Sequence, residues 1–394
     1  MPIISAPLVL VDGEMQGPAS IVIEGDRIVD VVDGRTDGDG QLAFREGMLS
    51  AGLVDLQING AFGIDFVSAS EAGWETVASR LLGTGVTSFL PTFTTAPIET
   101  LLGGLERAAA ARQHLAGGAN ARLIGVHLEG PFLSPAQPGV HPREHMLHPS
   151  QDHLDALLAG EDSRRIISMM TLAPELPGAV DAVRRLVRAG IRVSVGHTDA
   201  TAAEVRAATD AGACMVTHIF NAQRRLGHRE PGVPGQALSD PRLVVGLIAD
   251  LMHVAAEIVT VVMNAAAGRV ALVTDALAAA GMPPGRYELG DTLIDLPSDG
   301  LARNAAGAIA GSTLTLDQAV RNIVGLGFSP AVALEAASRA PADVLGRKDI
   351  GRLAPGACAD IVWWSNDLRP LRTWVGGLQS ESSFRAAPEL AGNA

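Results

Sequence analysis

The sequence predicts an α/β protein: a (β/α)8 TIM-type barrel with a small β-sandwich domain formed by the N- and C-terminal segments. Two patterns predict this fold. Eight short, almost continuously apolar runs follow one another through the middle of the chain, with helical patterns between them, as in parallel strands that are covered on both faces. The two ends instead carry short alternating segments interrupted by glycine-rich turns, which are typical of antiparallel strands.

The eight apolar runs are the expected barrel strands. An open, doubly wound sheet is the alternative, but a glycine-rich phosphate-binding turn usually follows the first strand of such a sheet, and none follows the first run here. We therefore expect a barrel over residues 52–349 and a small β domain over residues 1–51 and 350–394. The runs are LVDLQIN (53–59), VTSFLPT (86–92), LIGVHLE (123–129), IISMMTLAPE (166–175), RVSVGH (192–197), CMVTHIF (214–220), VVGLIAD (244–250) and ALVTDA (271–276).

Local signals mark the segments between these runs. Ser68 and Glu71 have the spacing of a capping box at the start of a helix, and Thr201 and Glu204 repeat that spacing. After the last run, residues 283–311 have the turn-rich, alternating pattern of a hairpin insertion. We therefore expect helices between most strands and one hairpin after the last strand.

The composition limits the classes of partner. The formal net charge is −13 at pH 7, and an acidic surface repels nucleic acids and anionic membranes, so we expect neither as a partner. The N-terminal stretch has no basic region ahead of a cleavage site, no apolar run reaches the length of a membrane span, and only two cysteines occur. These features predict a cytoplasmic protein.

Polar side chains gather where the expected strands end. In a barrel the carboxyl ends of all strands meet at one face, where active sites lie. We therefore expect these residues, although far apart in sequence, to come together in space. They are Gln57, Asn59, His127, Glu129, His197, His218, Asp250, His253 and Asp275.

Three of these residues have the chemistry of a metal site. Catalytic Zn²⁺ binds imidazole and carboxylate ligands and keeps one position for water, and Glu129, His197 and His218 would supply such ligands from three strand ends. Asp275 would then be the base that takes a proton from water and returns it to a leaving group. An isolated Asp before a helix is more often an N-cap, which is the alternative role for Asp275.

Seven short motifs occur in order along nearly the whole chain: LVDLQING, HLEGPF, GHTDAT, THIFNA, REPG, IADLMHV and LVTDA. Together they resemble the N-acetylglucosamine-6-phosphate deacetylases of the amidohydrolase superfamily. The resemblance implies deacetylation of N-acetylglucosamine 6-phosphate to glucosamine 6-phosphate and acetate, by a metal-activated water with Asp275 as general base and acid. It also implies one divalent metal ion per subunit, either Zn²⁺ or one of Fe²⁺, Co²⁺ and Mn²⁺.

The resemblance further implies roles for individual residues. Glu129, His197 and His218 match the metal ligands, and His141 matches the histidine that helps to polarise the acetyl carbonyl. A homodimer is implied, because in relatives part of the phosphate pocket comes from the neighbouring subunit. Arg229 and His253 match the phosphate-binding pair. The residues that match substrate contacts are Val140, His141, Asn221, Ala222, Arg229, Asp250, His253, Ile309, Ala310, Gly311 and Ser312.

The first strand departs from the wider superfamily. Many amidohydrolases carry His-x-His there and bind a second metal, whereas this chain has Gln57 and Asn59. Neutral amides are weak Zn²⁺ ligands, so we expect them to fill the vacated second-metal position by hydrogen bonds or to orient a water. His127 shares a strand face with Glu129, and we expect it to be a supporting partner of the metal site.

Other functions fit parts of the sequence. A related amidohydrolase could act on N-acetylgalactosamine 6-phosphate or on an N-acyl amino acid with the same metal chemistry. A metal-free barrel could serve as a scaffold, which the metal-ligand pattern disfavours. A lysine-dependent aldolase is disfavoured because the chain has a single lysine, Lys348. The loop of residues 132–149 is expected at the mouth of the site, where it could act as a lid.

Overall fold

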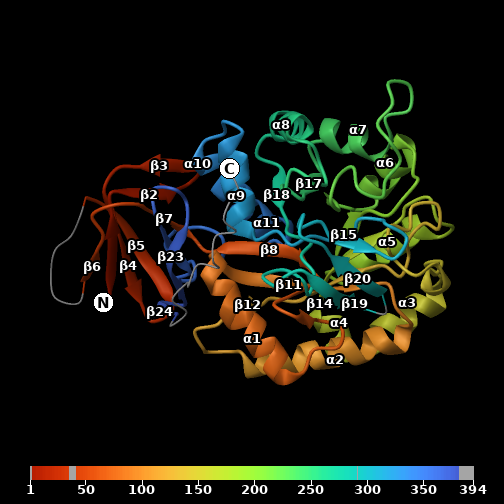
Figure 1. Cartoon of the computed structure of the whole chain (residues 1–394), viewed down its shortest axis with the longest axis horizontal. Helices are drawn as coiled ribbons and strands as arrows, with labels where there is room; N and C mark the ends of the chain where they lie inside the picture. Colours follow the sequence, from red (N-terminus) through yellow and green to blue (C-terminus); the bar gives the residue numbers. More distant parts are fainter. Residues whose placement is uncertain (1, 35–40, 291, 381–394) are drawn as a thin grey trace.

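Two β-containing parts lie side by side in the computed structural model, which describes residues 2–34, 41–290 and 292–380 (Figure 1). The larger part is a barrel of parallel strands. Each apolar run of the sequence overlaps one of its strands, and the strands pair in the order in which they occur along the chain. These strands are β8 (Leu53–Ile58), β11 (Val86–Thr94), β13 (Val126–Glu129), β14 (Ile167–Leu172), β15 (Arg192–Val195), β16 (Met215–Val216), β17 (Val244–Leu247) and β18 (Val270–Leu272). The predicted barrel is confirmed.

The barrel closes between its first and last strands by a short contact. Ile58, at the end of β8, forms an isolated parallel bridge with Ala276, which follows β18. The amide of Asp275 donates to the carbonyl of Gln57 at 2.8 Å, and the amide of Asn59 donates to the carbonyl of Ala276 at 2.7 Å. This seam therefore brings the ends of the first and eighth strands into direct contact.

Helices surround the barrel (Figure 1), and some of them begin at side-chain caps. They are α1 (Glu71–Leu81), α2 (Ile98–His114), α3 (Gln151–Leu158), α4 (Glu161–Ile166), α5 (Ala179–Arg188), α6 (Ala202–Asp210), α7 (Gly232–Ser239), α8 (Ala256–Ala265), α9 (Leu316–Gly325), α10 (Pro330–Ala337) and α11 (Arg339–Val344). The capping box of Thr201 and Glu204 is confirmed at α6. The box expected from Ser68 is wrong, because Ser70 caps α1 by accepting the amide of Gly73 at 3.2 Å.

The smaller part is built from both ends of the chain, as predicted. One sheet has the order β5-β4-β1-β6 and the other the order β24-β23-β22-β7-β2-β3. The N-terminal strands are β1 (Ile3–Ala6), β2 (Leu8–Val11), β3 (Glu14–Gln16), β4 (Ala19–Glu24), β5 (Arg27–Asp33), β6 (Gln41–Ala43) and β7 (Met48–Ala51), and the C-terminal strands are β22 (Ile361–Trp364), β23 (Pro370–Val375) and β24 (Leu378–Gln379). Both sheets share one apolar core, which includes Ile21 and Ile361.

The exact domain boundaries stay predictions. The antiparallel pairing of β7 with β22 joins segments that are about three hundred residues apart, and Arg122 of the short strand β12 (Arg122–Leu123) forms an ion pair with the buried Asp360. Residues 35–40 and 381–394 of the expected β domain lie outside the described residues. Among the residues that the structure does describe, none of the helices has the length and hydropathy needed to cross a membrane.

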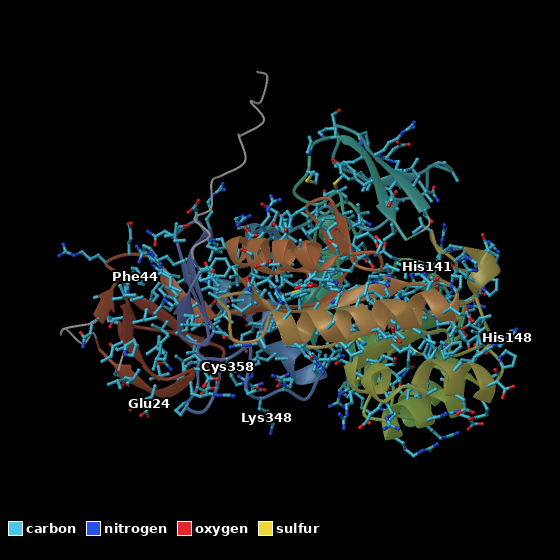
Figure 2. All side chains as sticks on the ribbon, turned by 90° about the horizontal axis from the view of Figure 1, so that it is seen from below. Glu24, Phe44, His141, His148, Lys348 and Cys358 are labelled. Carbon is cyan, nitrogen blue, oxygen red and sulfur yellow. The ribbon has the colours of Figure 1, made fainter. Side chains whose placement is uncertain are left out.

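The predicted hairpin insertion follows the eighth strand. Strands β19 (Gly285–Leu289) and β20 (Thr292–Leu296) pair antiparallel, and β21 (Arg303–Asn304) adds to β20. A second small pair, β9 (Gly60–Ala61) and β10 (Ile64–Asp65), follows β8. In Figure 2 the hairpin stands out from the barrel on the side where His141 lies. The insertion therefore projects over the face that carries the strand ends.

Candidate active site

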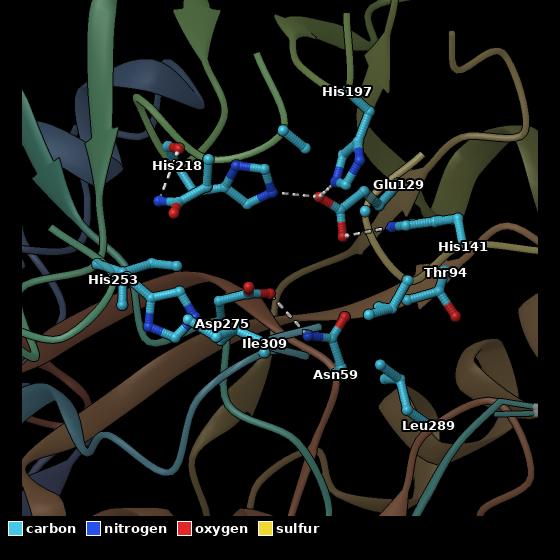
Figure 3. Close-up of a pocket in the computed structure, with 16 residues that line it drawn as sticks. Asn59, Thr94, Glu129, His141, His197, His218, His253, Asp275, Leu289 and Ile309 are labelled. Atoms are coloured by element: carbon cyan, nitrogen blue, oxygen red, sulfur yellow. Dashed lines mark hydrogen bonds and ion pairs between the residues drawn. The ribbon is translucent and has the colours of Figure 1, made fainter. Parts of the chain in front are cut away.

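A cavity of about 140 Å³ opens among the carboxyl ends of the barrel strands (Figure 3). Some lining residues end or follow β8, β11, β13, β15, β16, β17 and β18. Others belong to the loop around residues 139–141 and to the insertion around residues 289–311. The lining residues are Asn59, Thr94, Glu129, Gly139, Val140, His141, His197, His218, Asn221, Ala222, Ile248, His253, Asp275, Leu289, Ile309 and Gly311. Most of the polar residues singled out in the sequence therefore do meet.

The backbone turns sharply at three residues of the site. His197, His218 and Asp275 follow β15, β16 and β18, and they have φ angles of 47°, 27° and 49°. Residues other than glycine rarely adopt positive φ, and such strain clusters at functional sites because the surrounding structure must hold it. Here each turn ends a strand and directs its side chain into the cavity (Figure 3).

Three imidazoles converge on one buried carboxylate. The Nε2 atoms of His218 and His197 lie 2.9 and 3.2 Å from Oε1 of Glu129. The Nε2 atom of His141 lies 3.7 Å from Oε2 of the same carboxylate. All four side chains are buried, and a buried charge without partners would be very costly. A carboxylate among imidazoles, held in this way, is a donor set suited to a divalent metal ion.

One group of possible metal ligands in this cluster differs from the predicted ligand set. Ligand atoms of Glu129, His141 and His197 all lie within 4.8 Å of one another, whereas the sequence favoured His218 over His141. His218 nevertheless reaches Glu129 more closely than His141 does. The other ring nitrogen of His218, Nδ1, is buried without a hydrogen-bond partner among the described residues. The structure thus offers three imidazoles, not two, for the predicted metal.

Backbone packing fixes the position of His197. Its Nδ1 lies 3.2 Å from the carbonyl oxygen of Gln137, in the loop of residues 132–149. Gly139 of that loop has φ of 58°, and a Cβ atom there would lie 2.9 Å from Cε1 of His197. Only glycine lets the loop approach the ring so closely. The loop therefore covers His197 and carries His141 to the cavity.

The charges of the cluster shift its pKa values. Burial favours a raised pKa for Glu129, but hydrogen bonds and charges from His197 and His218 outweigh it and leave that pKa well below its usual range. Burial raises the pKa of Asp275 to about 6, and the charge of Glu129 adds to this effect. Burial, together with the charge of His197, lowers the pKa of His141 to about 3. Glu129 is therefore an anion, and His141 is a neutral imidazole.

The two amides of the first strand bind the two carboxylates. Gln57 donates from Nε2 to Oε1 of Glu129 at 3.0 Å and to Oδ1 of Asp275 at 3.1 Å. Asn59 donates from Nδ2 to Oδ1 of Asp275 at 2.8 Å. Gln57 thus links the carboxylate of the expected metal site to the expected base, and Asn59 adds a second hydrogen bond to that base. Both amides therefore have buried hydrogen-bond partners, whereas their place at a vacated second-metal position stays a prediction.

Comparison with known proteins shows the family. Residues 48–380 match the model of the amidohydrolase family. The chain belongs to the amidohydrolase family. An N-acetylgalactosamine-6-phosphate deacetylase of Escherichia coli O157:H7 is 39% identical over 84% of this chain and 87% of its own length. The human N-acetylglucosamine-6-phosphate deacetylase is 37% identical over 93% of this chain and 89% of its own length.

Solved structures agree with this assignment. The D267A mutant of the N-acetyl-D-glucosamine-6-phosphate deacetylase from Mycobacterium smegmatis, in complex with N-acetyl-D-glucosamine-6-phosphate, superposes with a TM-score of 0.89. It is 33% identical, and the match covers 96% of this chain and 99% of that chain. The amidohydrolase described here therefore shares its whole architecture with that deacetylase.

The expected substrate residues of this amidohydrolase do not all reach the cavity. His253 lines it, and Asp250 holds His253 from behind with Oδ2 2.6 Å from Nδ1. Arg229 is exposed and does not line the cavity of a single subunit. The residues at the cavity include Val140, Asn221, Ala222, Ile309 and Gly311, whereas Ala310 and Ser312 lie behind its wall.

Ser312 and His127 do not line the cavity, and their hydrogen bonds connect parts of the barrel. The amide of Ser312 donates to the carbonyl of Asp275 at 2.8 Å, so Ser312 helps to fix the turn at that residue. His127 lies 2.8 Å through Nε2 from the hydroxyl of Thr171 and 3.1 Å through Nδ1 from the carbonyl of Leu56. Its hydrogen bonds therefore join β13 to β14 and β8, and none of those described goes to Glu129.

Sequence reasoning missed four lining residues: Thr94, Gly139, Ile248 and Leu289. Thr94 ends β11 and Ile248 directly follows β17, so both lie at strand ends, as the polar candidates do, and their positions carried that signal. Leu289 had no such signal, because an apolar residue in a hairpin pattern is ordinarily part of a local core. Its place at the cavity depends on how the insertion folds back.

Proposed function

We propose that this amidohydrolase removes the acetyl group of N-acetylglucosamine 6-phosphate, giving glucosamine 6-phosphate and acetate. The observation that carries the proposal is the buried carboxylate of Glu129, which three imidazoles approach, beside a second buried carboxylate, Asp275. That arrangement suits metal-assisted hydrolysis. The substrate is suggested by the names of relatives that match most of the chain.

Glu129, His197 and His218 would hold one divalent metal ion, Zn²⁺ or a similar ion. When bound, such an ion lowers the pKa of water and polarises a carbonyl oxygen. His141 faces the same carboxylate from its other oxygen and hydrogen bonds through Nδ1 to the hydroxyl of Thr95 at 3.0 Å. That contact orients the ring, so its Nε2 can interact with the acetyl carbonyl.

Asp275 would move the protons of the reaction. Its raised pKa, about 6, suits a group that accepts a proton and returns it near neutral pH. Both amide donors, from Gln57 and Asn59, reach Oδ1, so Oδ2 is the oxygen that we assign to the water proton. Asp275 then protonates the departing amine, because an unprotonated amide nitrogen leaves poorly.

The phosphate would lie at the His253 end of the cavity. Oδ2 of Asp250 lies 2.6 Å from Nδ1 of His253, and this contact fixes the orientation of the ring at that end of the cavity. Arg229, which is exposed in one subunit, would reach the phosphate of a neighbouring subunit in a homodimer. Arginine suits phosphate because its planar fork donates two parallel hydrogen bonds.

The direct test is amine release from N-acetylglucosamine 6-phosphate by the purified, metal-analysed protein, with and without a chelator. Chelator-sensitive release is expected. Absence of release by protein that carries stoichiometric metal would contradict the proposal.

A second candidate substrate is N-acetylgalactosamine 6-phosphate, because the deacetylase of that compound from Escherichia coli is 39% identical to this chain. The two sugars differ only in the configuration at C4. The same assay with both epimers, at matched concentrations, compares their kcat/KM values. A higher kcat/KM for the galactose epimer would assign the chain to that substrate.

A further inference from the structure

Among the described residues of the β19–β20 hairpin, Leu289 is the one that lines the cavity. Leu289 ends β19, is only 5% exposed and lines the cavity together with Thr94. In Figure 3 it lies across the pocket from His253, on the side of Asn59 and Thr94. The hairpin thus borders the side of the cavity opposite the proposed phosphate position.

A buried carboxylate anchors the tip of the hairpin. The amide of Gly290 donates to Oδ2 of Asp65 at 3.0 Å, and Oδ1 of Asp65 accepts the amide of Val67 at 2.9 Å. A second cavity of about 410 Å³ is lined by Asp65 and Tyr287, so packing against the barrel is incomplete on that face of the hairpin. The Asp65 contact is therefore important for the position of Leu289.

The other support is a small apolar core within the insertion. It contains Leu289 and Ile294 of the hairpin together with Leu277, and Val140 packs against it. Val140 precedes His141, whose Nε2 faces Glu129. The core therefore links the hairpin tip to the loop that carries His141.

The chemistry of the proposed reaction gives this end of the cavity a role. The acyl carbon must lie between the Glu129 cluster and Asp275, and it bears two substituents, the amide nitrogen and the acyl chain. When the sugar extends toward His253, the acyl chain points the opposite way, toward Thr94 and Leu289. An aliphatic side chain there can pack against a methyl group, and Thr94 and Leu289 line the space that a longer chain would need.

We propose that Leu289, held in place by Asp65, sets the size of the acyl group and restricts the enzyme to N-acetyl substrates. This inference rests on the proposed deacetylase function. One methylene group in an apolar pocket commonly changes kcat/KM by about 10-fold to 200-fold. Enlarging the site at Leu289 should therefore admit N-propionyl substrates, and filling it should favour N-formyl substrates.

The test compares N-formyl, N-acetyl and N-propionyl forms of glucosamine 6-phosphate as substrates of the metal-loaded enzyme. Leu289→Ala should raise the propionyl-to-acetyl ratio of kcat/KM by roughly 10-fold or more, and Leu289→Phe should raise the formyl-to-acetyl ratio. Leu289→Val opens less space than Leu289→Ala and should give an intermediate propionyl-to-acetyl ratio. This variant provides the test if the alanine variant does not fold.

The matched control is Leu293→Ala in the same hairpin. Leu293 is 52% exposed and does not line the cavity, so both ratios should equal those of the wild type. Asp65→Asn places an amide where the carboxylate accepts the Gly290 amide, and it should raise the propionyl-to-acetyl ratio while Leu289 is intact.

Two negative results have different meanings. If the wild type hydrolyses the N-acetyl substrate but folded Leu289 variants keep its acyl preference, the size role of Leu289 is wrong and the deacetylase function stands. If the metal-loaded wild type hydrolyses none of the three amides, the proposed function fails and the inference fails with it.

Discussion

Replacing Asp55 by asparagine should remove a pH-dependent loss of stability. Asp55 lies on β8 and is fully buried. Its Oδ2 accepts the hydroxyl of Thr274 at 2.6 Å, and its Oδ1 accepts the amides of Gln57 and Thr274 at 3.2 and 3.3 Å. Burial raises the pKa of Asp55 from 3.8 to about 7, despite these hydrogen bonds.

The sign and size of the effect follow from this pKa. A carboxyl group whose pKa is raised by folding stabilises the folded state below about pH 4, and this contribution is lost as the pH rises toward 7. At about 1.4 kcal/mol per pKa unit, the complete loss is about 4 kcal/mol, of which about 3 kcal/mol falls between pH 5 and pH 8. Asparagine resembles the neutral acid in shape, so it should not show this loss.

The assay is urea denaturation of the wild type and Asp55→Asn in chelator at pH 5, 6, 7 and 8. The free energy of unfolding of the variant, relative to the wild type, should rise by about 3 kcal/mol from pH 5 to pH 8. Asp33→Asn, at an exposed position, is the matched control and should show no such trend. A difference between Asp55→Asn and the wild type that stays constant over this pH range would refute the reasoning.

Three further predictions concern the site and the join between the two parts. Asp275→Asn should lower kcat by roughly 10²-fold to 10⁴-fold, with substrate binding retained in equilibrium titration, because it removes proton transfer; an unchanged kcat would exclude Asp275 as the base. Arg229→Ala should lower kcat/KM for the phosphorylated substrate by about 10-fold to 100-fold and leave an unphosphorylated analogue unaffected, whereas equal losses would argue against phosphate binding. Arg122→Ala leaves Asp360 buried without its cation and should lower the free energy of unfolding by about 3 kcal/mol. Denaturation measures this loss, and the control is Arg27→Ala, whose side chain is more exposed.

Much of the site could be predicted because its residues follow strands. In parallel strands that close into a barrel, the carboxyl ends share one face, so Glu129, His197, His218 and Asp275 could be grouped from the sequence. Gln57 and Asn59 could be placed beside them because residues two apart share a strand face. Their shared partner, the carboxylate of Asp275, depends on the seam between β8 and β18.

Residues on loops could be placed only by tertiary structure. His141 belongs to a group of ligand atoms within 4.8 Å of one another because the loop of residues 132–149 folds back over His197. Arg229 also belongs to a loop that follows a strand end, yet it is exposed. Loop backbones have no fixed periodicity, so sequence spacing does not determine where their side chains point.

The sequence by itself determined the barrel, the terminal β domain and the identity of the reactive groups, because apolar periodicity and strand order are local properties of the chain. Tertiary structure decided which imidazoles reach Glu129, which carboxylate the two amides bind, and that Leu289 lines the cavity. These contacts depend on distances between segments that are remote in sequence, and those distances are fixed only when the strands, loops and hairpin pack together.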